Sequence, residues 1–295
     1  MSNRSSLAPT SISKTADPRR VQRVVTGEPT SDGAGVKLTR IVGTRALPDL
    51  DPFLMLDEFR SDDPAAYLAG FPDHPHRGFE TVTYMLAGRM RHGDNKGNKG
   101  LLGPGSVQWM TAARGIVHSE MPEQQDGLMW GFQLWINLPA KEKMSEPRYQ
   151  DIPASDLPLV KLPDGVHVKV IAGAFADARG PVAPKATAPL FLDVEIPAGG
   201  RFEADVPAEA NAFTYIYDGA AEIGSAGDGR VLGRGQLGLL GPGTSFQARA
   251  ADKPARLLLL AGRPLNEPVA KYGPFVMNTT AELHQAVADF RAGRF

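Results

Sequence analysis

Short apolar runs alternate with turns rich in glycine and proline along most of the chain. Residues 36–42 and 81–86 carry the β-branched and aromatic side chains that are typical of strands. Segments 30–35 and 93–100 have the small, polar composition of turns. The pattern therefore predicts an all-β fold.

A helical pattern appears only near the end of the chain. Thr279 and Glu282 have the spacing of a capping box. Apolar residues then follow at the i, i+3, i+4 and i+7 positions of an amphipathic helix, from Leu283 to Phe290. We expect a short C-terminal helix that packs on the barrel preceding it in sequence.

Two sequence blocks occur twice in the same order. Thr-Tyr-Met-Leu-Ala-Gly at 83–88 is echoed at 214–219, with an offset of 131 residues, and Leu-Leu-Gly-Pro-Gly at 101–105 recurs at 239–243, with an offset of 138. Such a repeat indicates two copies of one β-barrel unit. We expect a disordered tail at 1–18, a first barrel at 19–139, an irregular linker at 140–163 and a second barrel with the helix at 164–295.

Composition and charge exclude several kinds of partner. The 295 residues carry a formal net charge of -1 and contain no cysteine, so neither direct nucleic-acid binding nor membrane binding is expected. The absence of thiols excludes disulfides and thiolate metal sites and suits a reducing compartment. With no secretory signal and no apolar run of about eighteen residues, we expect a cytoplasmic protein.

Candidate metal ligands gather in two short segments, one with His74 and His76 and the other with His118 and Glu120. Residues at i and i+2 of a strand share one face, with Cα atoms about 6.6 Å apart. Two imidazoles can then reach one ion at about 2.0–2.1 Å. Three imidazoles and one carboxylate suit a first-row divalent metal, and six-coordinate Fe(II) would keep two positions open.

Chance surface histidines are the alternative, but three of the six histidines lie in these two segments. The spacing leaves open whether Glu80 or Glu120 is the carboxylate ligand, because Glu80 shares a face with His74 and His76 if no bulge intervenes. We expect His92 to be exposed in a turn.

The same residues resemble known motifs. His74, His76, Glu80 and Gly88 resemble the first cupin motif, while His118 follows residues 103–105 at a longer distance than the second motif usually has. Longer blocks resemble the pirin family: Asp-Pro-Phe-Leu at 51–54, Phe-Pro-Asp-His-Pro-His-Arg-Gly-Phe-Glu-Thr-Val at 71–82, Gln-Trp-Met-Thr-Ala at 108–112, His-Ser-Glu-Met-Pro at 118–122 and Gly-Pro-Phe-Val-Met-Asn-Thr at 273–279.

The resemblance to pirins implies two cupin-type barrels, each a double-stranded β-helix or jelly roll. It also implies a metal bound by His74, His76, His118 and Glu120, with Glu80 orienting an imidazole from behind. The activity it implies is that of a quercetin 2,3-dioxygenase, which opens the heterocyclic ring of flavonols with release of carbon monoxide. Fe(II) is the metal we expect, and other divalent first-row metals would also suit the ligands.

The second barrel is not expected to hold such a site. The offset of 131 carries His74 and His76 onto Asp205 and Pro207, and that of 138 carries His118 onto Arg256. No histidine lies between residues 167 and 284. We expect this barrel to act as scaffold, lid or docking surface.

Large apolar residues near the ligands are expected to form mainly barrel core, with a few lining a pocket for a flat aromatic molecule. They are Phe53, Met85, Trp109, Met110, Met121, Trp130, Phe132 and Trp135.

The sequence supports two main hypotheses about function. The first is an iron-dependent dioxygenase that acts on a small aromatic substrate and dioxygen, with Glu120 as general base. The alternative is a non-enzymatic regulator whose metal or redox state controls binding to a protein partner, as described for some pirins. A zinc cupin isomerase acting on sugar phosphates lacks the basic cluster that it would need.

Overall fold

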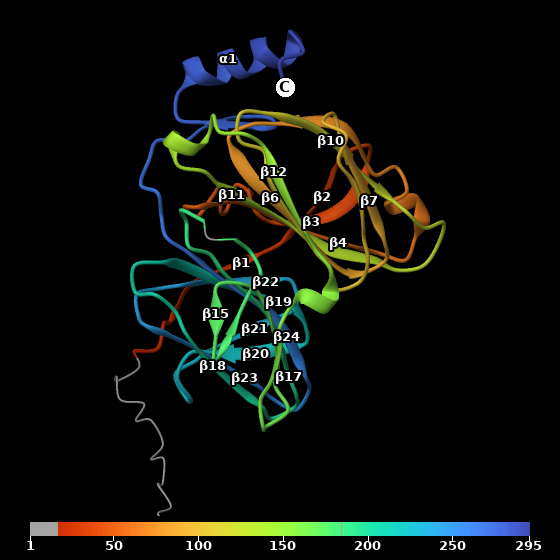
Figure 1. The fold of residues 1–295 in the computed structure, drawn as a ribbon. Coiled ribbons are helices and arrows are strands. Elements are labelled where there is room, and N and C mark those ends of the chain that lie inside the picture. Colours follow the sequence, from red (N-terminus) through yellow and green to blue (C-terminus); the bar gives the residue numbers. More distant parts are fainter. Residues whose placement is uncertain (1–16, 184) are drawn as a thin grey trace, which may run out of the picture.

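A computed structural model describes residues 17–183 and 185–295. The predicted disordered tail, apart from its last two residues, lies outside this part of the chain. Two antiparallel β-barrels are stacked on each other, and the single described α-helix covers the far end of the first barrel (Figure 1). The predicted all-β class with two cupin-type barrels is confirmed.

The first barrel consists of a seven-stranded and a four-stranded sheet. The seven-stranded sheet has the order β12 (Arg148–Ile152), β9 (Val107–Thr111), β6 (Phe79–Ala87), β11 (Met129–Asn137), β4 (Phe53–Ser61), β3 (Val36–Val42) and β2 (Glu28–Asp32). The four-stranded sheet has the order β5 (Phe71–His76), β10 (Ile116–Pro122), β7 (Met90–Asp94) and β8 (Lys99–Leu102).

The second barrel repeats this arrangement. Its large sheet has the order β1 (Val21–Thr26), β22 (Gln236–Leu240), β19 (Asn211–Asp218), β24 (Ala255–Gly262), β17 (Leu190–Ile196), β14 (His167–Ala172) and β13 (Leu159–Lys161). Its small sheet has the order β18 (Arg201–Asp205), β23 (Ser245–Ala250), β20 (Ala220–Ile223) and β21 (Arg230–Gly233). Two short hairpins complete the strands: β15 (Ala174–Phe175) with β16 (Ala178–Arg179), and β25 (Ala270–Tyr272) with β26 (Phe275–Met277).

Some segments join a different barrel from the one that sequence assigned to them. Strand β1, which falls within the range expected for the first barrel, pairs with β22 of the second. The expected linker is partly ordered as strands, because β12 pairs with β9 of the first barrel and β13 with β14 of the second. Only β1 therefore crosses to the other barrel, whereas the expected linker extends the first barrel with β12 and the second with β13.

Only one of the two repeated sequence blocks is structurally equivalent. Strands β6 and β19, which carry the first block, occupy the same place in their sheets. The second block ends β8 in the first barrel but β22 in the second, one strand further along. The offset of 138 was therefore wrong, and the counterpart of β10 is β23. Strands β18 and β23 contribute apolar side chains to the interior of the second barrel, namely those of Phe202, Ala204, Phe246 and Ala248.

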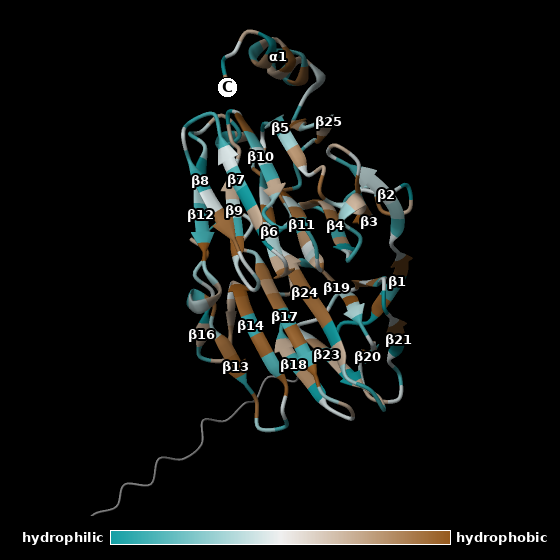
Figure 2. Ribbon diagram, turned by 90° about the vertical axis from the view of Figure 1, so that its right-hand side faces the viewer, coloured by the Kyte–Doolittle hydropathy of each residue, from teal (hydrophilic) through white to brown (hydrophobic). Residues whose placement is uncertain are grey.

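The two seven-stranded sheets pack against each other and form the largest hydrophobic cluster. It combines Val82, Trp109 and Phe132 of the first barrel with Tyr215 and Leu258 of the second, all at most 1% exposed. Apolar stretches along β14 and β24 are visible in Figure 2. Each barrel therefore depends on the other to bury the outer face of its large sheet.

The helix α1 (Thr280–Arg291) begins with the predicted capping box, in which Thr279 accepts from the Glu282 amide and Glu282 accepts from the Thr279 amide. It does not pack on the preceding barrel as expected. Its apolar face meets Val117 of the first barrel, so α1 closes the end where β5 and β10 lie (Figure 1). Among the described helices, none is long and apolar enough to cross a bilayer.

Candidate metal centre

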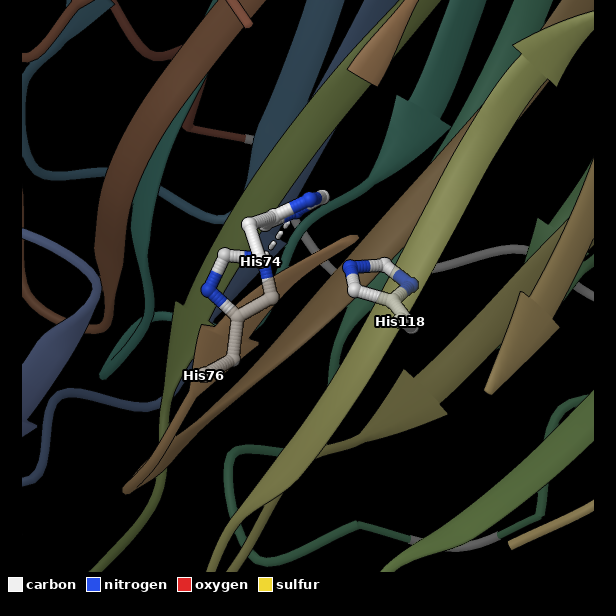
Figure 3. Close-up of side chains that lie close together, drawn as sticks. All are labelled: His74, His76 and His118. Carbon is white, nitrogen blue, oxygen red and sulfur yellow. Dashed lines mark hydrogen bonds between the residues drawn. The ribbon is translucent and has the colours of Figure 1, made fainter. Parts of the chain in front are cut away.

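Three imidazoles from two neighbouring strands meet inside the first barrel, as the spacing predicts (Figure 3). His74 and His76 lie on β5, and His118 lies on β10 directly opposite His74 in the ladder. One ring nitrogen of each lies within 4.8 Å of the others. The centroids of the His74 and His118 rings are 4.4 Å apart, and those of His76 and His118 are 5.0 Å apart.

The hydrogen bonds of His74 determine which of its nitrogens is free. Its Nδ1 lies 2.9 Å from the carbonyl oxygen of Pro72, and a carbonyl only accepts, so Nδ1 carries the proton. In the neutral ring, Nε2 then has a lone pair. That atom lies 3.0 Å from Nε2 of His76, so both nitrogens face one small space, where a cation would bind their lone pairs.

Burial of the other two imidazoles also fits a metal. Neither ring nitrogen of His118, nor Nδ1 of His76, has a hydrogen-bond partner among the described residues. Burial, followed by the neighbouring rings His118 and His74, holds the pKa of His76 well below its usual value. Burial likewise lowers the pKa of His118 to about 4. Both rings are therefore neutral at pH 7, which is the form that binds metals.

Glu120 lies beside this cluster with its carboxylate held by two donors. The Thr83 hydroxyl donates to one oxygen at 2.6 Å, and the Gln133 amide donates to the other at 2.8 Å. Burial opposes ionisation of Glu120, but His118 and these two hydrogen bonds outweigh it, so its pKa lies below the ordinary value. Glu120 is therefore a buried, ionised carboxylate next to the neutral imidazoles of His76 and His118.

Glu80 does not orient an imidazole, so that expectation was wrong. Its carboxylate accepts from the Thr111 hydroxyl at 2.6 Å and from Lys185 Nζ at 2.8 Å. The extended backbone is interrupted between β5 and β6 at Gly78, whose φ is 91°. The alternation of side chains along β5 therefore does not carry on into β6, and Glu80 does not lie on the face of His74 and His76. Glu80 and Val82 are two residues apart on β6, so both side chains lie on the face towards the second barrel.

The prediction that His92 is exposed in a turn was also wrong. It is 3% exposed rather than solvent-facing, and its Nε2 lies 3.0 Å from Asp151 Oδ2. It lies opposite Glu120 in the β7–β10 ladder. His92 thus belongs to the buried polar surroundings of the centre, whereas His284 is exposed on α1.

A pocket of about 620 Å³ opens beside the cluster. His74, His76 and Glu120 line it, and so does Trp135, the one expected pocket residue of the apolar set that is found there. Its other apolar walls are Leu38, Met55, Phe59, Phe71, Pro72, Met90 and Pro274. The expected core role holds for Phe53, Trp109, Trp130 and Phe132, which lie in the cluster between the barrels.

Several residues of the site were not identified from sequence. Thr83 and Gln133 bind Glu120, and at the pocket wall Arg40 forms a bidentate pair with Asp57 at 2.9 and 2.7 Å. Arg40, Asp57, Gln133 and Thr83 face one another along a row across β3, β4, β11 and β6. Their one signal in the sequence was the presence of polar residues within otherwise apolar strands.

The fold and this site define the class of the molecule. Two cupin barrels in one chain, with a three-histidine cluster in the first and an apolar interior in the second, are those of a bicupin. The family model described as Pirin matches residues 35–136, and the Pirin C-terminal cupin domain matches residues 191–295. The chain belongs to the pirin family.

Individual relatives agree with this assignment. A pirin-like protein of Caulobacter vibrioides is 52% identical over 94% of this chain and 99% of its own length. A Pseudomonas aeruginosa protein named "Putative quercetin 2,3-dioxygenase" is 49% identical over 93% and 97%. The crystal structure of quercetin 2,3-dioxygenase from Acinetobacter baumannii superimposes with a TM-score of 0.87 and 34% identity, over 94% of this chain and 98% of that one.

Proposed function

We propose that this pirin is an Fe(II)-dependent dioxygenase that acts on flavonol-like aromatic molecules, as a quercetin 2,3-dioxygenase does. One observation carries the proposal: three converging imidazoles, two of them buried and that of His74 half-buried, and a buried carboxylate lie at the side of an open, largely apolar pocket. Two similar proteins, one named a putative quercetin 2,3-dioxygenase and the other a quercetin 2,3-dioxygenase, support the same chemistry.

The ligands in this proposal are His74, His76, His118 and Glu120. The first three each offer one ring nitrogen within 4.8 Å of the others, and Glu120 supplies the negative charge that a divalent cation favours. When bound, iron would supply a Lewis acid for a substrate hydroxyl and the redox capacity that reaction with dioxygen requires. Thr83 and Gln133 would fix the carboxylate from behind.

Glu120 is also the proposed general base. Because its pKa is held below the ordinary value, the carboxylate is available at neutral pH to accept the proton of a substrate hydroxyl. Its hydrogen bond from Thr83 leaves the carboxylate in a defined orientation towards the pocket. Removal of the hydroxyl proton is the step that a flavonol needs before its enolate carbon becomes reactive towards dioxygen.

The shape of the pocket favours a flat aromatic ligand. Trp135, Phe59 and Phe71 line it beside the histidines, and such rings stack well on other aromatic rings. A pocket of about 620 Å³ lies within the usual size range for small-molecule sites. Arg40 is paired with Asp57, and so it offers no free basic cluster for a phosphorylated sugar.

The test is oxygen uptake by the Fe(II)-loaded protein with quercetin, together with detection of carbon monoxide. We expect His74→Ala and His118→Ala to bind less iron and to lose turnover while retaining their circular dichroism spectra. His284→Ala, on an exposed position of α1, is the matched control. Stoichiometric iron without oxygen uptake for any of several flavonols and catechols would refute the enzyme and favour a metal-dependent binding protein.

A further inference from the structure

The residue after His76 is a buried arginine that ties the metal strand to the end of the chain. Arg77 is 3% exposed, and its Nη1 donates to Asp289 Oδ2 of α1 at 2.7 Å. Its Nε donates to the carbonyl oxygen of Arg114, in the turn that precedes β10. A single side chain therefore connects β5, the start of β10 and the last helix.

The backbone around Arg77 is bound to the same distant segment. The Val276 amide donates to the Arg77 carbonyl at 3.0 Å, and the Arg77 amide donates to the Pro274 carbonyl at 3.3 Å. Buried Lys143 donates to the carbonyls of Gly78 at 2.7 Å and Val276 at 2.9 Å. The approach is so close that a Cβ on Gly78 would lie 1.9 Å from the Val276 oxygen.

The same segment contacts the strand that carries His118. The Phe295 ring packs on Gly115, where an added Cβ would lie 2.8 Å from it, and the Arg77 guanidinium lies 4.4 Å from the ring centroid. Asn95 donates from Nδ2 to the Phe295 carbonyl at 2.9 Å. Its backbone amide donates to the Val117 carbonyl at 2.9 Å.

We propose that residues 273–295 form a clamp that sets the position of His76 relative to His118, with Arg77 and Asp289 as its positioning residues. Two of the three imidazoles lie one and three residues from the backbone that the clamp holds, at Arg77 and Gly115. The clamp follows the second barrel in sequence and crosses back over the first, as Figure 1 shows for α1. A segment that follows the second barrel in sequence therefore positions the candidate metal ligands of the first.

The two oxygens of Asp289 allow a matched pair of variants. Oδ2 accepts from Arg77, whereas Oδ1 accepts from Gln285 at 2.8 Å and from Arg294 Nη2 at 2.6 Å. The side chain of Arg294 is 56% exposed, and it donates only to Oδ1, not to the Oδ2 atom that accepts from Arg77. Removing Arg294 leaves the clamp in place, whereas removing the carboxylate of Asp289 leaves Arg77 buried without its partner.

The proposal rests on the proposed function only in that the histidine cluster binds metal, so the probe is Co(II) alone, with no substrate. Metal-free wild type, Asp289→Ala, Asp289→Asn and Arg294→Ala would be titrated with Co(II), and affinity and the visible absorption band would be recorded. We expect about 10–100-fold weaker binding and an altered band for Asp289→Ala. Asp289→Asn, which keeps an acceptor for Arg77, should lie between it and wild type, and Arg294→Ala within about threefold of wild type.

Thermal unfolding of the metal-free variants separates positioning from general stability. Unchanged Co(II) affinity and spectrum in both Asp289 variants would overturn the clamp, whatever their melting temperatures. An equal loss in Arg294→Ala would also overturn it, since stability of α1 would then explain the effect. If wild type binds no Co(II), both proposals fail, whereas Co(II) binding without quercetin turnover refutes the dioxygenase alone.

Discussion

At the residue scale, the site depends on polar partners for its one carboxylate. Glu120 is 2% exposed, and each of its oxygens has a donor, Thr83 or Gln133. A buried carboxylate without donors would take up a proton instead. The ionised state of Glu120 is therefore maintained by His118 and by two neutral side chains that are not candidate ligands themselves.

Gln133→Leu should raise the pKa of Glu120, because it removes one hydrogen bond to the charged form and leaves its burial unchanged. The acidic limb of the pH profile of kcat/KM should move to higher pH, and metal affinity should fall about 10–100-fold. Thr83→Ser keeps the other donor and serves as the control, with little change in either measurement. An acidic limb that stays in place would show that Glu120 is not the titrating base.

The metal-free protein should lose stability as pH falls from about 6.5 towards 4. The pKa of His118 is lowered by burial to about 4, so the unfolded chain binds a proton on this ring before the folded chain does. The contribution of His118 to the free energy of unfolding is present in full above about pH 6.5, the pKa of the ring in the unfolded chain. It amounts to about 3 kcal/mol and is lost as the pH falls towards 4. Urea unfolding at pH 7 and pH 5 measures it, and His118→Gln should show a smaller difference between the two.

At the element scale, strand β6 serves two purposes on its two faces. Thr83 faces the interior and binds Glu120, whereas Glu80 and Val82 face the second barrel. Regular alternation of side chains from β5 through Gly78 into β6 would put Glu80 on the face of His74 and His76, but the positive φ at Gly78 separates the two strands. Glu80 therefore contributes to the interface between the barrels and not to the metal centre.

Lys185→Met is expected to destabilise the fold without affecting metal binding. Lys185 and Glu80 are 7% and 1% exposed at their side chains, and loss of one partner of a buried pair typically costs about 3–5 kcal/mol. Chemical unfolding of the variant and its Co(II) affinity would be compared with those of Lys96→Met, on an exposed turn. A large loss of metal affinity would show that Glu80 acts on the centre after all.

At the scale of the whole molecule, the two barrels share buried apolar and polar contacts. Their large sheets share the main apolar cluster, and polar groups also bridge them: Tyr84 donates to Asp193 at 2.5 Å, and Tyr215 donates to Glu58 at 2.5 Å. Separation of the barrels would expose the apolar faces of both sheets and leave these buried groups without partners.

A core truncation in the second barrel should therefore unfold the first. Leu258 on β24 is fully buried in the shared cluster, and Leu258→Ala should cost about 2–5 kcal/mol. All three tryptophans lie on strands of the first barrel, and Trp135 packs on Phe79 outside the shared cluster, so the fluorescence change includes unfolding of the first barrel. We expect the fluorescence and circular dichroism midpoints to fall together, with Val231→Ala, 68% exposed on β21, as the control. A fluorescence midpoint that stays in place would mean independent barrels.

The sequence alone was sufficient to predict the all-β class, the two barrels, the capping box of α1 and the meeting of His74, His76 and His118. These features depend mainly on local patterns: i, i+2 spacing puts two side chains on one face of a strand. The residue types of the two histidine segments indicated a shared ion, although β6 to β9 separate β5 from β10 in sequence. That the second barrel would lack a three-histidine cluster followed directly from where histidines occur, since His167 on β14 is the one histidine on its described strands.

Tertiary structure alone decided which carboxylate lies by the cluster, which barrel receives β1, and where α1 packs. Each depends on contacts between residues far apart in sequence, such as Glu80 with Lys185 and Arg77 with Asp289. Local patterns in the sequence indicate whether a side chain is polar and whether one face of a strand or helix is apolar. They do not specify the partner, because that choice is made by the packing of sheets and the helix against one another.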